Sequence, residues 1–243
     1  MRVLYNNVAI EAAITATSEN VNFPLGNLFV PALSTPYRSL ATPVDLYLTF
    51  DVEEAINCIS LAGHNLTTLR YRVYDIGDNI VEDVSLIEVE PTAMIYLSQS
   101  TAKKIRLTMN SDETYISIGA LFTGMYYQMP YPVAYYDETI EMTNERFETA
   151  FGQVFGSDGE FLQTYSPEFV NITMAQFNAI KTMLEAVRNF VPLFVDMTED
   201  AHEYKAPLYC TVSLDSIPNS RYSRANRIDG QKRTISLKIR EAK

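Results

Sequence analysis

The chain has 243 residues, enough for two domains of common size, and its 47% hydrophobic and 20% charged content is that of an ordinary globular protein. Thirty acidic against 19 basic residues give a formal net charge of −11. Such a surface repels the phosphate backbone that supplies most nucleic-acid affinity, so we predict no direct binding of DNA or RNA.

The N-terminal sequence "MRVLYNNVAIEAAI" lacks the basic and unbroken apolar regions of a secretory signal. No window of the chain approaches the 18 or so consecutive apolar residues of a membrane-spanning helix. We therefore expect synthesis and folding in a cytoplasm, without membrane insertion. The only cysteines, Cys58 and Cys210, each lie in an apolar run, which favours two free core thiols over a disulfide.

Residues 13–39, "AITATSENVNFPLGNLFVPALSTPYRS", place Ser, Asn, Pro and Gly around a few large apolar side chains. These residue types favour turns for different physical reasons, and together they predict a long shaped loop. The segment contains neither a catalytic nucleophile nor a phosphate-binding cradle.

From residue 44 the chain is dominated by short runs of period two. In "DLYLTFDV", Leu46, Leu48 and Phe50 fall on one face, which is typical of a half-buried strand. Six similar runs follow: "INCISLAG", "LRYRVYDI", "VSLIEV", "AMIYLS", "KIRLTMN" and "YISIGALFTG". Because no helical pattern separates them, they predict an antiparallel β-sandwich.

A tyrosine- and proline-rich stretch, "GMYYQMPYPVAYYDETIEM", follows the sandwich. Proline disfavours a continuous central strand, so we place the domain boundary here and predict domains at 1–130 and 131–243. The tyrosines have two interpretations, a platform that stacks on sugars or a linker packed between domains, and we favour the linker.

The second domain is predicted to be a small antiparallel β domain with one helix. Gly-rich residues 156–159 suggest a hairpin tip. The helix is predicted at 173–190, with Thr173 and Gln176 as a capping box. Its apolar stripe is Phe177, Ile180, Leu184, Val187 and Val191. The basic residues of 221–243 run into the alternating "RTISLKIREA", which favours a solvated strand face or a contact with an acidic neighbour over a nucleic-acid contact.

The sequence offers little for catalysis. His64 and His202 are the only histidines. His64 follows Gly63 at a strand end, where a side chain often bonds a loop backbone. His202, near acidic residues 199, 200 and 203, is either a weak metal ligand or, as we favour, a surface histidine. Since no nucleophile, P-loop or dinucleotide motif occurs, we predict no enzyme activity, no metal and no cofactor.

The landmarks of the first half resemble a known module. Asn22-Phe23-Pro24, Asn27-Leu28, Tyr37-Arg38-Ser39 and Gly63-His64-Asn65-Leu66 match the discoidin-like, galactose-binding-like β-sandwiches of tailed-bacteriophage virion proteins, where a Trp usually stands in place of Tyr37. The order of helix, "VPLFVDM" and closing "RTISLKIREA" in the second half resembles the tail-tube-like β domains of distal tail proteins.

The resemblance implies a galactose-binding-like jelly-roll sandwich followed by a tail-tube-like domain. It implies a structural virion protein of a phage tail tip or baseplate, assembled in the host cytoplasm as a homo-oligomer with tail-tube and hub proteins. The alternative is a carbohydrate-binding receptor adaptor for a host surface glycan. The candidate ligand or interface residues are Tyr37, Arg38, Tyr126 and Tyr127.

Overall fold

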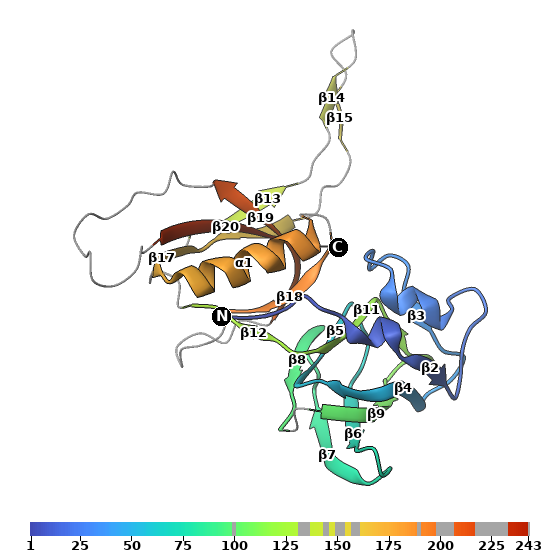
Figure 1. The fold of residues 1–243 in the computed structure, drawn as a ribbon. Helices are drawn as coiled ribbons and strands as arrows, with labels where there is room; N and C mark the ends of the chain where they lie inside the picture. Colours follow the sequence, from blue (N-terminus) through green and yellow to red (C-terminus); the bar gives the residue numbers. More distant parts are fainter. Residues whose placement is uncertain are drawn as a thin grey trace. The chain divides into compact units, whose positions relative to one another are not determined.

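The computed structural model describes residues 1–98, 101–130, 137–142, 146–148, 154–156, 161–188, 191–197, 207–216 and 233–242 (Figure 1). The chain divides into two compact units. The first contains Met1–Met129 with Val191–Tyr209, and the second contains Pro130–Phe190 with Cys210–Ala242. The division into domains at 1–130 and 131–243 stays a prediction. The contacts within the chain place Val191–Tyr209 in the same unit as the sandwich, apart from the residues next to it in sequence.

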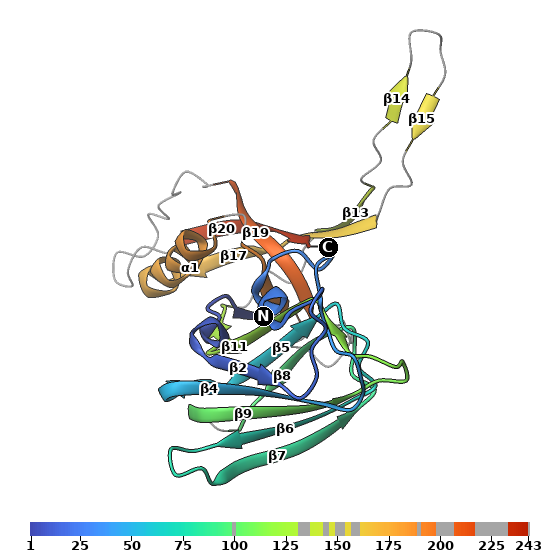
Figure 2. The same ribbon diagram turned by 90° about the vertical axis from the view of Figure 1, so that its right-hand side faces the viewer.

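The first unit contains a five-stranded antiparallel sheet in the order β2-β4-β9-β6-β7, most of which Figure 2 shows side by side. Its strands are β2 (Ala13–Ala16), β4 (Val44–Ala55), β6 (Thr68–Tyr74), β7 (Ile80–Ile87) and β9 (Thr101–Asn110). In β4, Leu46, Leu48 and Phe50 are buried as the period-two pattern predicts. The alternate side chains form the open face of this sheet.

A smaller antiparallel sheet, β11-β5-β8, provides the other layer of the sandwich. Its strands are β5 (Cys58–Ala62), β8 (Thr92–Tyr96) and β11 (Ala120–Gly124). Leu46, Leu69 and Leu107 of the first sheet belong to the same buried cluster as Leu61 and Leu121 of the second. The antiparallel β-sandwich that the strand pattern predicts is therefore confirmed.

A third layer covers the outer face of β5 and β11, which are buried along their whole length. It is the strand set β12-β1-β18, formed by β12 (Tyr127–Gln128), β1 (Arg2–Leu4) and β18 (Leu193–Asp196). The Phe122 ring of β11 lies edge-on to Phe194 at 5.2 Å and to Tyr209 at 6.3 Å. Two short 3-10 helices, η1 (Val8–Glu11) and η2 (Leu25–Phe29), and the strand pair β3 (Tyr37–Arg38) and β10 (Ser117–Ile118) complete the unit.

The second unit is a smaller antiparallel sheet with the one α-helix in the described residues. Strands β19-β20-β16-β13 pair in that order, and β17 also pairs with β20. Their bounds are β13 (Asp137–Met142), β16 (Phe161–Ser166), β17 (Glu168–Ile172), β19 (Leu208–Ser216) and β20 (Arg233–Glu241). Strands β14 (Arg146–Glu148) and β15 (Val154–Gly156) form a separate pair. The predicted hairpin tip at 156–159 lies, beyond Gly156, outside the described residues.

Helix α1 (Met174–Val187) runs beside β17 and β20 (Figures 1 and 2). The predicted capping box is confirmed, since Thr173 accepts from the Gln176 backbone while the Gln176 side chain accepts from the Thr173 backbone. The helix is shorter than the predicted 173–190 because Arg188 adopts a left-handed cap at φ 48°. The mainly β fold class, with one helix on an antiparallel sheet, is as predicted.

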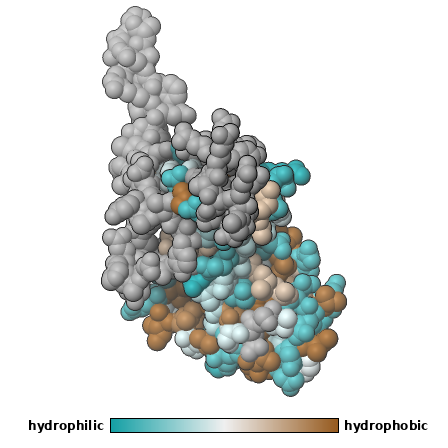
Figure 3. All heavy atoms as spheres, turned by 60° about the vertical axis from the view of Figure 1, so that its left-hand side comes forward, coloured by the Kyte–Doolittle hydropathy of each residue, from teal (hydrophilic) through white to brown (hydrophobic). Residues whose placement is uncertain are grey.

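On the described part of the face that Figure 3 shows, brown apolar residues lie scattered among teal hydrophilic ones. Exposed apolar side chains come from separate parts of the chain, such as Ile10 in η1 and Val21, Leu40 and Ile76 in loops. Isolated exposed apolar residues are ordinary on soluble domains and by themselves mark no interface.

Candidate binding site

Tyr37 and Arg38 form β3 and point in opposite directions, as neighbours on a strand must. The Tyr37 side chain is fully buried, and its hydroxyl donates a hydrogen bond of 2.5 Å to the Ser18 carbonyl. Burial, with a smaller contribution from nearby Glu19, raises the pKa of Tyr37 to about 12. The ring has no face open to a ligand, so Tyr37 is a core residue and not the ligand or interface residue that we predicted.

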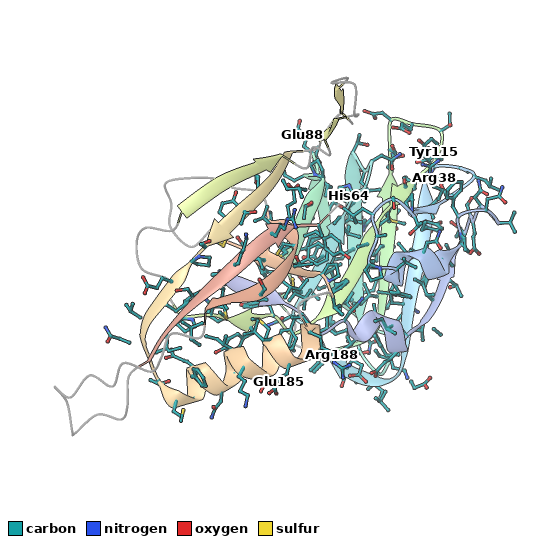
Figure 4. All side chains as sticks on the ribbon, turned by 90° about the horizontal axis from the view of Figure 1, so that it is seen from above. Arg38, His64, Glu88, Tyr115, Glu185 and Arg188 are labelled. Carbon is teal, nitrogen blue, oxygen red and sulfur yellow. The ribbon has the colours of Figure 1, made fainter. Side chains whose placement is uncertain are left out.

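Arg38 lies between two aromatic rings. Its guanidinium carbon is 4.4 Å from the Phe23 ring centroid and 5.6 Å from that of Tyr115. Figure 4 labels Arg38 and Tyr115 at the same end of the first unit. Such cation–π contacts hold the planar group in place without consuming its hydrogen-bond donors.

Arg38 also has no acidic partner in the described part of the chain, in contrast to the other arginines of the first unit. Arg2 pairs with Asp196, Arg70 and Arg72 pair with Asp83, and Arg106 pairs with Asp45. Arg38 forms no ion pair with any described residue, and its Nε atom is buried without a hydrogen-bond partner among them. A half-buried guanidinium with unused donors is a ready site for a ligand that offers acceptor oxygens.

Loop residues complete what we call the Arg38 site, made of Phe23, Arg38, Glu113 and Tyr115. The Tyr115 hydroxyl bonds the Glu113 carboxylate, and this bond raises the pKa of the tyrosine. On the other side, the Arg38 N–H donates to the Phe23 carbonyl at 3.1 Å and its carbonyl accepts from Asn20 at 2.9 Å. Donor, acceptor and ring faces are therefore gathered on loops held by the sandwich.

The sequence analysis identified Arg38 but missed Tyr115 and Glu113. Their signal was weak, because "SDETY" looks like an ordinary polar turn until β10, which begins two residues after Tyr115, pairs with β3. Pairing of Ser117 with Arg38 brings residues almost 80 positions apart in sequence into one site.

His64 has the structural role that its position predicted. Its Nδ1 accepts a hydrogen bond of 3.3 Å from the Leu66 N–H, while Gly63 turns the chain at φ 62°. Burial lowers the pKa of His64 to about 4, partly offset by the Glu90 backbone, so the ring is neutral at pH 7. His64 therefore fixes the loop after β5.

Tyr126 and Tyr127 belong to a different set of contacts from the Arg38 site. The Tyr126 ring lies edge-on to Tyr96 at 5.3 Å, and Arg2 lies 4.4 Å from the Tyr96 ring and 5.7 Å from the Tyr126 ring. The Tyr96 hydroxyl and Arg2 both bond buried Asp196. Tyr127 lies on β12 opposite Val3. The structure thus does not bring these tyrosines together with Arg38.

The described residues provide no group of three or more His, Cys, Asp or Glu side chains that could hold a metal ion. His202 and its acidic neighbours lie outside the described residues. Both cysteines are buried and free, as predicted, and burial raises the pKa of the Cys58 thiol to about 12. Such a thiol is unreactive at neutral pH. In the described part of the chain, no helix is both long and apolar enough to span a membrane.

No protein-family model matches the chain, and no curated protein matches its sequence. Among solved structures it is similar to a Streptococcus pneumoniae fucose binding module, at 10% identity and a TM-score of 0.43, covering 49% of this chain and 95% of that one.

Two further similarities have the same extent. The galactose complex of the family 32 CBM from C. perfringens NanJ is 17% identical, with a TM-score of 0.43 over 52% of this chain and 100% of that one. The lectin binding domain of Lectinolysin complexed with Lewis b is 8% identical, with a TM-score of 0.44 over 50% of this chain and 96% of that one. Similarity this low does not transfer a ligand from one chain to another, and the Arg38 site has to be judged by its own geometry.

Proposed function

We propose that the chain is a non-enzymatic binding protein whose sandwich recognises a saccharide at the Arg38 site. The observation that carries the proposal is the half-buried Arg38 guanidinium, which stacks between Phe23 and Tyr115 and has no acidic partner among the described residues. Saccharide hydroxyls are acceptors that a planar guanidinium bonds well, and aromatic rings pack on the apolar faces of sugar rings.

The alternative explanation for Arg38 is that it only holds the loops together. Stacking on two rings stabilises the loops modestly, by about 0.5 to 1 kcal/mol per exposed contact. Stacking does not explain why the Arg38 Nε is buried without a hydrogen-bond partner. The carboxylate of the same site, Glu113, bonds Tyr115. A bound acceptor oxygen would satisfy that atom, which supports the ligand explanation.

The test is binding of the full chain to a glycan array, followed by calorimetry on any saccharide that binds. Galactose- and fucose-terminated glycans are suitable first probes, since the similar structures include a fucose binding module and a galactose complex. We expect Arg38→Ala to weaken binding at least tenfold and Tyr115→Ala at least fivefold. Lys181→Gln, which removes one positive charge from an exposed position on α1, should leave binding unchanged.

Arg38→Lys separates the two explanations further. Lysine keeps the charge and loses the planar fork, so it should stabilise the loops almost as well yet bind the saccharide poorly. Full binding by a folded Arg38→Ala variant, or no saccharide bound by the wild type at millimolar concentration, would overturn the proposal.

The tail-tip or baseplate role, with its tail-tube and hub partners, homo-oligomeric state and virion location, stays a prediction from the sequence resemblance. It is compatible with saccharide binding, since a tail protein can also be a receptor adaptor. The two roles separate in one preparation: an assembly protein forms rings or copurifies with tail fragments at micromolar concentration. A pure glycan-binding module remains monomeric there.

A further inference from the structure

A second polar surface lies on the open face of the five-stranded sheet, which points away from the buried cluster. One row across this face is Tyr47, Arg106, Arg72 and Asp83, on four neighbouring strands β4, β9, β6 and β7. Figure 2 shows that β9 and β6, which carry the two arginines, are central strands of the sheet. We call Tyr47, Arg72, Tyr74, Lys104 and Arg106 the sheet-face site.

The two arginines stand in an unfavourable position relative to each other. Arg72 and Arg106 are direct partners in the antiparallel register of β6 and β9. Like charges directly opposite each other on adjacent strands destabilise a sheet. Breaking this pairing rule at the centre of a sheet points to a functional reason for keeping both charges.

The neighbouring carboxylates compensate the two charges unequally. Arg106 donates through Nε and Nη2 to Asp45 at 3.1 and 2.7 Å, so one edge of its fork is occupied. Arg70 holds Asp83 with two bonds of 2.6 Å. Arg72 reaches the same Asp83 through Nε alone, at 3.1 Å. The terminal amino groups of Arg72 thus have donors to spare beside Arg106.

Basic side chains on this face are only nearly balanced by carboxylates, whereas the whole chain carries −11. Arg70, Arg72, Lys104 and Arg106 all project from it, while its own strands supply the carboxylates of Asp45 and Asp83. Asp78, from the hairpin between β6 and β7, reaches Lys104 at 2.7 Å. The four basic groups exceed the three carboxylates paired with them by one, so an anionic group meets less repulsion on this face than a chain of this net charge offers on average.

Two tyrosines flank the arginine pair and add apolar contact area. Lys104 Nζ lies 4.4 Å from the Tyr74 ring centroid, and the Arg106 guanidinium carbon lies 5.5 Å from the Tyr47 ring centroid. Both rings are half-buried and held by these contacts. Ring edges and hydroxyls next to fixed guanidinium groups fit a sugar that carries an acidic substituent.

We propose that the sheet-face site binds the carboxylate or sulfate group of an acidic saccharide polymer between Arg72 and Arg106. The site is separate from the Arg38 site and does not depend on it. Duplex DNA is also a polyanion, so it is the competing occupant that the test has to distinguish from the acidic polysaccharide.

The test measures binding of the full chain to polygalacturonate, dextran sulfate and neutral dextran by affinity electrophoresis and calorimetry in 50 mM salt. We expect binding to at least one acidic polymer and none to neutral dextran. Binding to polygalacturonate alone identifies the carboxylate as the recognised group, and binding to dextran sulfate alone identifies the sulfate.

Arg72→Gln should weaken binding of the acidic polymer at least fivefold. Arg72→Lys should give an intermediate loss, because lysine keeps the positive charge but lacks the forked guanidinium. Lys181→Gln changes net charge by the same amount on an exposed part of α1 and should change affinity less than twofold. Arg38→Ala should leave binding of the acidic polymer unchanged, which separates this site from the first.

Three results would overturn the proposal: no acidic polymer binds, Lys181→Gln weakens binding as much as Arg72→Gln, or duplex DNA binds as tightly as the polysaccharide. The first two would show that the arginine pair has no ligand or that the attraction is only net charge. Near-ultraviolet circular dichroism of each variant verifies that the sandwich is folded.

Discussion

Asn7 completes the edge of β11 with its side chain. Its amide donates to the Leu121 carbonyl at 2.9 Å and accepts from the Thr123 N–H at 3.0 Å, as the backbone of a neighbouring strand would. The same oxygen accepts from the Ala9 N–H at 3.2 Å and caps η1. One side chain therefore satisfies three backbone groups where no strand pairs with them.

Asn7→Ala should lower the free energy of unfolding by about 2 to 4 kcal/mol, because two buried backbone groups of β11 lose their partner. Equilibrium unfolding in urea measures the loss. Asn22→Ala, at an exposed loop position, should change the stability by less than about 0.5 kcal/mol. A loss below about 1 kcal/mol for Asn7→Ala would show that water replaces the amide.

His64 makes stability depend on pH. Its folded pKa of about 4 lies below the ordinary 6.5, so between these values the unfolded chain binds a proton that the folded chain does not. Stability from His64 is present above pH 6.5 and is lost as pH falls towards 4, by up to about 3 kcal/mol. Urea unfolding of wild type and His64→Gln at pH 7.5 and pH 5 should show a smaller pH difference in the variant. Equal differences would contradict the assignment.

Tyr37 and Arg38 show what a residue pattern can and cannot predict. Period two correctly separates the two side chains onto opposite faces of a strand. The pattern does not say which of the two side chains is buried. Ser18 contacts Tyr37 and Tyr115 contacts Arg38, and both contacts join residues that lie far apart in sequence. Tyr37, one of the candidate ligand residues, therefore lies in the core.

At the scale of elements, helix α1 packs through a slightly different face from the one that the sequence indicated. Ile180 and Val187 are buried as predicted, and Met183 joins them, whereas Leu184 and Phe177 are half-exposed. Val191, predicted to extend the stripe, lies after the helix and is 42% exposed. The capping box was predictable from the sequence because Thr173 and Gln176 lie within one turn of the helix, so no long-range contact decides it.

Ile180→Ala should lower stability by about 2 to 5 kcal/mol through the cavity that it leaves, and Leu184→Ala should cost clearly less. The two substitutions are matched, since each shortens a four-carbon side chain to a methyl group on the same helix. Thermal and urea unfolding of the full chain provide the comparison. An equal or larger loss for Leu184→Ala would mean that Leu184 packs against more than the structure shows.

At the scale of the whole molecule, the first unit is built from two separate stretches of chain. Leu193, Phe194 and Val195 are fully buried, and β18 pairs with β1 through the register Val3 with Val195. A division at residue 130 could not foresee this, because "VPLFVDM" reads as a local strand, and only long-range pairing shows that it covers β5 and β11.

A fragment of residues 1–129 should therefore bind a hydrophobic dye and unfold without cooperativity. Adding a peptide of residues 191–209 should restore a cooperative transition. The same peptide with Phe194→Ala should restore it poorly, since Phe194 fills the space beside Phe122 and Tyr209. A cooperative transition in the fragment alone would show that the third layer is dispensable.

The pairing of β18 with β1 determines when the third layer can form during synthesis. After β1 is made, a ribosome must add the sandwich strands and about 60 residues of the second unit before the strand that pairs with β1 emerges. Meanwhile the outer faces of β5 and β11 stay uncovered, in a nascent chain whose exposed strands are prone to aggregate. Slow elongation or chaperone binding over residues 130–190 should matter more for the yield of folded protein than the same events near the start.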